Sequence, residues 1–140
     1  MSYSAGYGGW RRRPFNFSGN MPSIPLPPSG VTRIVSTVEH KGLDALIATR
    51  FARAPFVVVI DVSNNKVINV NFVQNSIATL PHGAGVALGQ WLISIGTDMV
   101  LATRLGPNVS MVLQHAGIKV KFVPPGTKLR DAIAGLGISI

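Results

Sequence analysis

Cysteine is absent from all 140 residues of this chain. Without thiols the chain can form no disulfide, no thiolate metal site and no cysteine nucleophile. A chain free of cysteine fits a cytoplasmic location, which we therefore expect.

Long apolar runs are also missing. No window of about 18 consecutive apolar residues occurs, because polar residues interrupt the longest candidate at Gln90, Ser94, Thr97 and Asp98. Residues 11–13 are arginines, but PFNFSGN follows them instead of an apolar segment, so no secretory signal is predicted. With 46% hydrophobic residues the chain can bury one ordinary core. We expect a soluble single domain with a tail.

Acidic residues are scarce: five Asp and Glu stand against 13 Lys and Arg, which gives a formal net charge of +8. Residues 1–30 hold three of the basic residues and no acid, so residues 31–140 carry ten basic and five acidic residues, or +5. Both parts are basic. Such a surface favours anionic partners, whether nucleic acid, phosphate or an anionic cofactor.

Residues 1–30 contain five glycines, five prolines and no periodic apolar pattern. This composition predicts a disordered tail that ends in a stiff, extended linker, PSIPLPPSG, with the domain at residues 31–140. The aromatic residues beside the three arginines could instead stack on bases or dock on a partner. A basic nucleic-acid-binding protein that uses this tail is therefore the alternative function.

The hydrophobic pattern divides the domain into strands and helices. Strands are predicted at 31–36, 56–62, 66–73, 98–103 and 118–123, and helices at 84–95 and 107–116. Thr127 is expected to cap a last helix with Leu129, Ile133 and Leu136 on its apolar face, and a short helical turn is possible within 42–49. Asn64 and Asn65 tolerate positive φ, which favours a hairpin between the second and third strands.

The order β, β, β, α, β, α, β, α indicates an α/β fold. Three strands forming a meander, followed by right-handed crossover units, give a mixed five-stranded sheet with helices packed on it. With the first strand central, the sheet order is 3-2-1-4-5 and strand two is antiparallel to the rest. This is an RNase H-like topology.

Several loops meet at one edge of such a sheet, where ligands usually bind. The loops expected there are residues 37–55, 75–85, 103–108 and 124–127. Their basic and imidazole side chains are His40, Lys41, Arg50, Arg53, His82 and Arg104. The acids among them are Glu39 and Asp44.

The stretch PHGAG at 81–85 stands at the start of a predicted helix. Gly83 and Gly85 would leave the first backbone N–H groups uncovered, and the helix dipole adds partial positive charge there. His82 could donate a hydrogen bond or ligate a metal through its neutral imidazole. The alternative is that both glycines serve close packing and His82 is a surface residue.

A second helix start follows Arg104, within Leu105-Gly106-Pro107-Asn108. Two helix N-termini together with Arg50, Arg53 and Arg104 predict a pocket for an anionic ligand. Gly106 and Asn108 are its further candidate residues.

Catalytic motifs are missing from the sequence. An RNase H-like nuclease needs clustered carboxylates to hold two metal ions. Here Asp61 and Asp98 are expected at the opposite edge of the sheet, and Asp131 on the last helix. No motif marks a serine or threonine nucleophile with its base. We therefore expect a protein that is not an enzyme.

Three stretches of the domain resemble one known family, the dinitrogenase iron-molybdenum cofactor biosynthesis proteins, which include cofactor carriers of nitrogenase assembly. RFARAPFVVVIDV at 50–62 resembles that family's HFGRAPxF segment, and PHGAG at 81–85 resembles GGHGAG. LGPNVSMVLQHAGIKV at 105–120 is similar to GIGPxAxxxLxxAGIxV. The resemblance covers roughly residues 31–137.

The resemblance implies a non-catalytic domain that binds or carries an anionic Fe–S or Mo–Fe–S cluster, or a precursor, with a delivery partner. The family's histidine in HFGRA is Arg50 here and its glycine is Ala52. This leaves His82 as the metal ligand that matches a motif.

Overall fold

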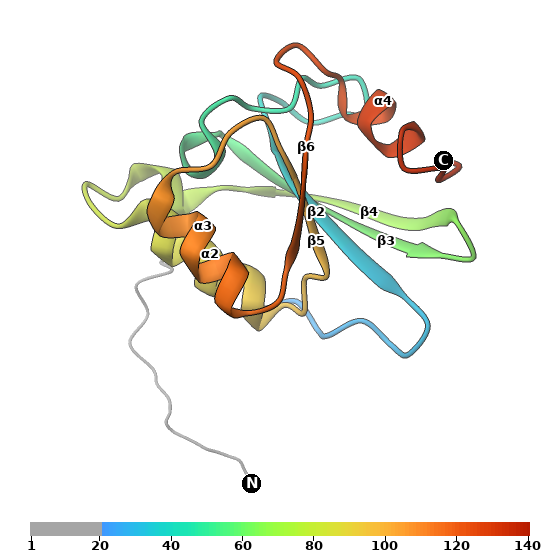
Figure 1. Ribbon diagram of the computed structural model, residues 1–140, viewed down its shortest axis with the longest axis horizontal. Helices are drawn as coiled ribbons and strands as arrows, with labels where there is room; N and C mark the ends of the chain where they lie inside the picture. Colours follow the sequence, from blue (N-terminus) through green and yellow to red (C-terminus); the bar gives the residue numbers. More distant parts are fainter. Residues whose placement is uncertain (1–20) are drawn as a thin grey trace, which may run out of the picture.

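A computed structural model describes residues 21–140, and the predictions made for residues 1–20 lie outside that range. A five-stranded sheet forms its centre (Figure 1). The strands are β2 (Thr32–Val38), β3 (Phe56–Ser63), β4 (Lys66–Gln74), β5 (Met99–Ala102) and β6 (Lys119–Phe122). The α-helices are α2 (Ala84–Ser94), α3 (Pro107–His115) and α4 (Leu129–Ala134), and the one-turn 3-10 helices are η1 (Phe51–Arg53) and η2 (Ser76–Thr79).

The sheet has the order β4-β3-β2-β5-β6, which confirms the predicted order 3-2-1-4-5. β3 is antiparallel to both β2 and β4, whereas β5 and β6 run parallel to β2 and to each other. The β3–β4 hairpin turns at Asn64 and Asn65, whose φ angles of 53° and 62° are left-handed as the sequence predicts.

Each face of the sheet carries its own apolar layer. One layer packs under α2 and α3 and contains Val35, Val57 and Val59, while the other packs under α4 and contains Ile34, Val58 and Ile60. Alternate residues of the central strands serve opposite faces, so the β-branched run of β3 is buried from Val57 to Val62. Figure 1 shows α2 and α3 side by side and α4 on the other side of the sheet.

Two local predictions were wrong. Residues 42–49 form no helical turn; instead Ile47 makes an antiparallel bridge with Val38, and Leu46 one with Lys128. The last helix is not capped by Thr127, whose hydroxyl donates to the Pro124 carbonyl oxygen at 2.6 Å, so that Lys128 takes the N-cap position. At residues 42–49, pairing with distant residues replaced a local preference, whereas at Thr127 one local hydrogen bond replaced another.

Residues 21–28 run extended along the domain, although they contain no helix or strand. Met21 and Ile24 pack against the core layer under α2, and the Trp91 indole N–H donates to the Pro22 carbonyl oxygen at 2.9 Å. The Arg33 guanidinium donates to the Pro25 carbonyl oxygen at 2.8 Å. This segment is therefore held by side chains of the domain.

Arg33 is buried on β2, with 4% of its surface exposed. Its Nε and Nη2 donate to the two carboxylate oxygens of Asp61 at 2.8 and 3.0 Å, and its Nη1 donates to the Ile95 carbonyl oxygen at 2.6 Å. Asp98 accepts from the backbone N–H of Arg33 at 2.8 Å. Asp61 and Asp98 thus serve the structure around one arginine.

Among residues 21–140, no helix is long and apolar enough to cross a membrane.

Candidate anion-binding site

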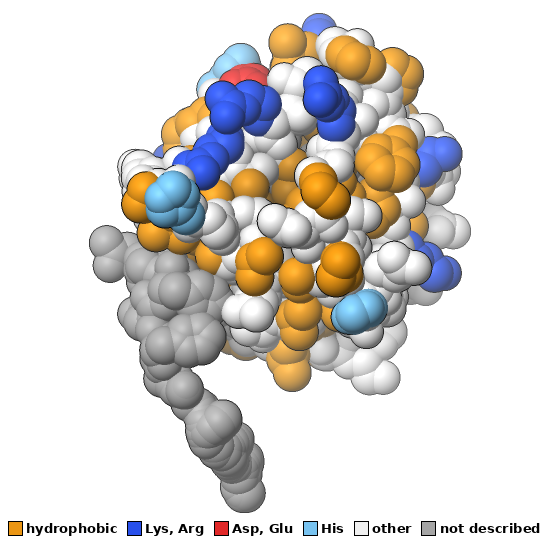
Figure 2. Space-filling view, turned by 60° about the vertical axis from the view of Figure 1, so that its left-hand side comes forward, with side chains coloured by type: hydrophobic (Ala, Val, Ile, Leu, Met, Phe, Trp, Pro, Cys, Tyr) orange, Lys and Arg blue, Asp and Glu red, His pale blue; other side chains and the backbone are white. Residues whose placement is uncertain are grey.

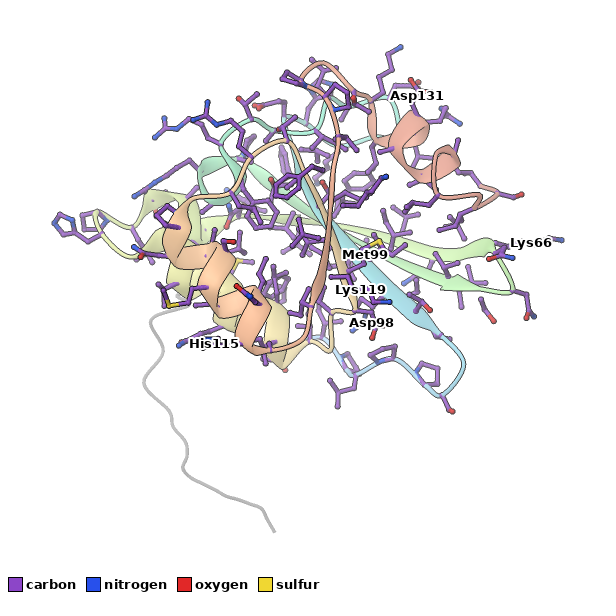
Figure 3. The ribbon with its side chains drawn as sticks, viewed as in Figure 1. Lys66, Asp98, Met99, His115, Lys119 and Asp131 are labelled. Atoms are coloured by element: carbon purple, nitrogen blue, oxygen red, sulfur yellow. The ribbon has the colours of Figure 1, made fainter. Side chains whose placement is uncertain are left out.

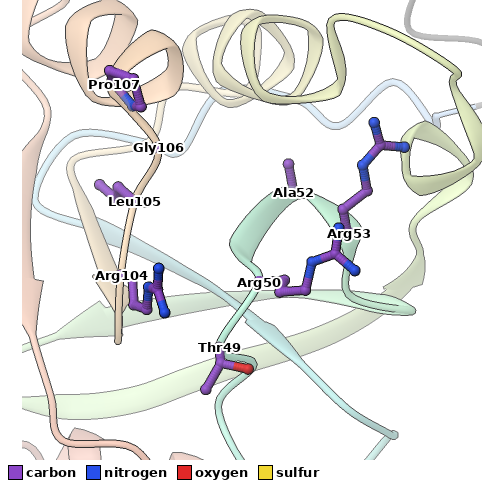
Figure 4. A pocket seen from close by; sticks show the side chains of 8 residues that line it. All are labelled: Thr49, Arg50, Ala52, Arg53, Arg104, Leu105, Gly106 and Pro107. Carbon is purple, nitrogen blue, oxygen red and sulfur yellow. The ribbon is translucent and has the colours of Figure 1, made fainter.

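Two adjoining cavities open where β2 and β5 end and where α2 and α3 begin. The larger has a volume of about 580 Å³ (Figure 4). Its lining residues are Thr49, Arg50, Ala52, Arg53, Arg104, Leu105, Gly106 and Pro107. Figure 4 shows Arg104 on one wall and Arg50 and Arg53 on the other.

The smaller cavity, of about 270 Å³, lies between the two helix N-termini. Its lining residues are Phe51, Ala52, Arg53, Gly83, Ala84, Gly85, Val86, Gly106, Pro107, Asn108 and Val109. Four residues line both cavities: Ala52, Arg53, Gly106 and Pro107. The two cavities therefore form one two-part hollow.

Long-range hydrogen bonds fix the walls of this hollow. The buried Asn75 amide donates to the carbonyl oxygens of Ala52 and Ala54, at 3.2 and 2.9 Å, and so holds η1 in place. The Thr103 hydroxyl donates to the Ala48 carbonyl oxygen at 2.8 Å and ties the loop after β5 to the loop before η1. The opposing walls are thus positioned by residues that do not line the cavities.

Positive charge is concentrated at the opening. Arg50, Arg53 and Arg104 are all exposed, and neither lining set contains an Asp or Glu. The Arg53 Nη1 also donates to the carbonyl oxygens of Ala78 and Leu80, at 2.9 and 2.5 Å. Arg53 therefore links η1 to η2 while it adds charge to the hollow.

Asp44, one of the two acids predicted at this edge, has a basic partner other than these arginines. Asp44 pairs with Arg130, whose Nε donates to its Oδ1 at 2.9 Å. That hydrogen bond, together with the charge of Arg130, lowers the pKa of Asp44 below its ordinary value. Figure 2 shows Lys and Arg side chains on the upper part of one face, with acidic atoms beside them.

Both helix N-termini present backbone N–H groups that no side chain caps. Gly83 precedes α2 and Gly106 precedes α3, and neither helix start has a side-chain cap hydrogen bond. The first N–H groups of a helix have no partner within the helix and carry partial positive charge. Two such ends at one hollow suit an anion that accepts hydrogen bonds.

The predicted site residues converge in part. Arg50, Arg53, Arg104, Gly83, Gly85, Gly106 and Asn108 line the hollow. His82 is exposed and belongs to neither lining set. His40 and Lys41 also lie outside them, and the Lys41 ammonium stands 5.7 Å from the centre of the Phe56 ring. Across residues 21–140 no group of three or more His, Cys, Asp or Glu could hold a metal ion.

Sequence reasoning missed the residues that shape the hollow. Thr49, Ala52, Leu105 and Pro107 line it, and Asn75 and Thr103 position its walls. Ala52, Leu105 and Pro107 lie within the same motif stretches as the predicted residues. Asn75 and Thr103 gave no such signal, because their partners are 21 and 55 residues away in the chain.

The two glycines before and within α2 have different roles. Gly83 has a φ of 76°, a left-handed conformation that other residues adopt only with strain, so a side chain there would disturb the fold. A Cβ built at Gly85 lies 3.4 Å from the Cβ of Val109, which is an ordinary packing contact. Gly85 is therefore the position where a side chain can be added without strain.

Gly85→Ala and Gly89→Ala are expected to differ in their effect on stability. At Gly85 the methyl group fits and alanine favours the helix, so the free energy of unfolding should stay constant or rise by up to about 1 kcal/mol. At Gly89 the new Cβ would lie 2.9 Å from Cγ1 of Val112 in α3, and overpacking should cost about 1–3 kcal/mol. Denaturant unfolding measures both, and equal losses would contradict the prediction.

A family model described as dinitrogenase iron-molybdenum cofactor matches residues 32–137. A search of curated proteins found no match.

Solved structures with this fold include the apo form of the orange protein from Desulfovibrio gigas. It is 37% identical, with a TM-score of 0.68 over 75% of this chain and 86% of its own. A Thermotoga protein of the DUF35 family, whose structure was solved by NMR, is 31% identical, with a TM-score of 0.63 over 76% of this chain and 87% of its own. A third structure, 24% identical with a TM-score of 0.63, shares the fold. Because the family match spans most of the domain, this chain belongs to the dinitrogenase iron-molybdenum cofactor family.

Proposed function

We propose that this protein is a non-catalytic domain that binds and carries an anionic metallocofactor, either an Fe–S or Mo–Fe–S cluster or a precursor of one. The main support for this proposal is the two-part hollow, in which three arginines and two uncapped helix N-termini meet without an acidic residue. We take the class of cargo, an iron- or molybdenum-containing cluster, from the dinitrogenase iron-molybdenum cofactor family to which the chain belongs. A protein that receives the cargo is the expected partner.

Charge and hydrogen bonding are the means of recognition that these residues offer. Thiolate ligation is impossible without cysteine, and His82 lies outside the lining of the hollow. Guanidinium groups and helix N–H groups, in contrast, attract sulfide- or oxide-bearing anions without forming a metal bond. The hydrogen-bond donors of the hollow therefore fit an anionic cargo that is bound without a bond from the protein to its metal. His82 is the candidate for one additional metal bond.

The proposal includes an RNase H-like fold without nuclease chemistry. Two-metal hydrolysis needs carboxylates that share metal ions about 4 Å apart. Figure 3 shows Asp98 and Asp131 well apart, the second on α4, and Asp61 is bonded to Arg33. A cytoplasmic location completes the proposal and agrees with a chain that lacks cysteine.

Binding of tetrathiomolybdate under anaerobic conditions tests the proposal. The double variant Arg50→Ala/Arg104→Ala should weaken binding by at least about tenfold, because it removes two of the three charges at the opening. Absorbance titration followed by metal analysis measures the retained molybdenum. The affinity of the unchanged protein should also fall as salt is added.

Lys119→Ala/Lys121→Ala is the matched control, since it removes two positive charges from β6, outside both lining sets. It should leave the affinity nearly unchanged. His82→Ala separates the two modes of recognition: retained binding indicates charge alone, and lost binding indicates a metal bond. If the unchanged protein retained neither tetrathiomolybdate nor reconstituted Fe–S or Mo–Fe–S clusters, the proposed function would be wrong.

A further inference from the structure

The two edge strands of the sheet, β6 and β4, are protected to different degrees against pairing with another chain. β6 has four residues, of which Lys119 and Lys121 are exposed, and charged side chains on a short edge strand discourage pairing with another chain. β4 has nine residues and, after Lys66, contains neither a charged residue nor a proline. Its pairing with β3 shifts register at Ile68, which lies between the paired residues Val67 and Asn69, so the edge lacks the usual protection from Asn69 onward.

Only the first part of the β4 edge is covered within residues 21–140. Ser139 bridges Lys66, and its carbonyl oxygen accepts from the Val67 N–H at 2.8 Å. No other described segment pairs with the outer side of β4, which is the terminal strand in the sheet order. Residues 68–74 thus present an open edge.

The two faces of this edge differ in polarity. Val70 and Phe72 are half-buried and pack against the layer under α4, whereas Asn69 and Asn71 are exposed on the opposite face. An added strand would match this edge if its apolar side chains fell on the α4 side and its polar ones on the other. β4 itself has that pattern.

A second copy of β4 fits in an antiparallel register centred on Asn71. In that register Asn71 faces Asn71 of the copy, Val70 faces Phe72, and residues 69 and 73 form the outermost pair. A two-fold axis perpendicular to the sheet keeps equivalent faces on the same side, so the apolar pairs extend the layer under α4. No charged residue lies in the paired strip, although each chain carries a net charge of +8.

We infer that residues 69–73 of β4 form a self-pairing surface, through which two copies of this chain join their sheets about a two-fold axis at Asn71. A five-residue strand pair is smaller than the standard interface of about 1,600 Å², so the dimer should depend on concentration. The hollow at the ends of β2 and β5 contributes no residue to this surface.

Sedimentation from about 10 to about 500 µM tests the inference by following the rise from one to two chains per particle. Asn71→Lys should keep the protein monomeric throughout, because it sets two like charges directly opposite each other. Gln114→Lys on α3 is the control for added charge and should dimerise normally. A protein that stays monomeric at the highest concentration would overturn the inference, and so would a dimer that Asn71→Lys leaves intact.

The lack of cysteine allows a second test in an otherwise thiol-free chain. Directly paired residues of antiparallel strands have Cα atoms about 4.5–5.5 Å apart, within the range for a disulfide. Asn71→Cys should therefore form a disulfide-linked dimer on mild oxidation. Asn69→Cys should not, because its counterpart would lie about 13 Å away along the strand. Cross-linking of the Asn69 variant, or of neither variant, would overturn the inferred pairing.

Discussion

Replacing Arg33 by methionine is expected to lower the free energy of unfolding by about 3–5 kcal/mol. The change leaves the Asp61 carboxylate, in a residue that is 8% exposed, without the two hydrogen bonds and the charge that compensate its burial. It also frees the carbonyl oxygens of Ile95 and Pro25. Denaturant unfolding, followed through Trp91 fluorescence, measures the loss.

Arg130→Met is the matched control for Arg33→Met. It breaks the other ion pair described, but both of its partners are exposed and such pairs contribute little. A double variant, Arg33→Met/Asp61→Leu, should lose less stability than Arg33→Met alone, because no buried charge remains. If Arg33→Met cost no more than Arg130→Met, Asp61 would be compensated by other groups.

Gly106→Asp is expected to abolish most anion binding while the fold stays intact. Gly106 lines both cavities, and a Cβ added there meets no atom within 4 Å. Its φ of −68° suits any residue. Aspartate at the N-cap position stabilises a helix more than glycine does, by about a few tenths of a kcal/mol. The new carboxylate would accept hydrogen bonds from the N–H groups at the start of α3. Its negative charge would also offset the positive charge of the arginines and repel an anion.

Tetrathiomolybdate affinity should therefore fall by at least about tenfold for Gly106→Asp, with a thermal midpoint equal to or above that of the unchanged protein. Gln90→Asp serves as the control, because Gln90 is exposed on α2 and lines neither cavity. It changes the net charge equally and should bind normally. Normal binding by Gly106→Asp would place the anion outside the hollow.

Gly83 and Gly85 illustrate what the sequence could and could not predict. In the stretch HGAG, at the start of a helix, these glycines could serve either access of an anion or close packing. The structure places Gly85 in the lining and in ordinary contact with Val109, while the close approach of α2 and α3 occurs at Gly89. Sequence spacing could not separate these roles, because they depend on where α3 crosses α2.

The sequence by itself determined the kinds of element and their order in the sheet. Periods of two and 3.6 residues, and the turn at Asn64 and Asn65, depend on neighbours in the chain. With the first strand placed at the centre, connection rules then predicted the order of strands that the structure has. The basic character of the loops at one edge was also readable, because charge is a property of each residue.

Only the tertiary structure decided which of those basic residues converge and which polar groups are buried. Arg50, Arg53 and Arg104 meet at the hollow because hydrogen bonds from Asn75 and Thr103 fix the loop paths, whereas His82 does not line it. Arg33 stands in an ordinary strand pattern, and its burial depends on Asp61, Ile95 and Pro25. Such contacts join residues far apart in the chain, so no local pattern encodes them.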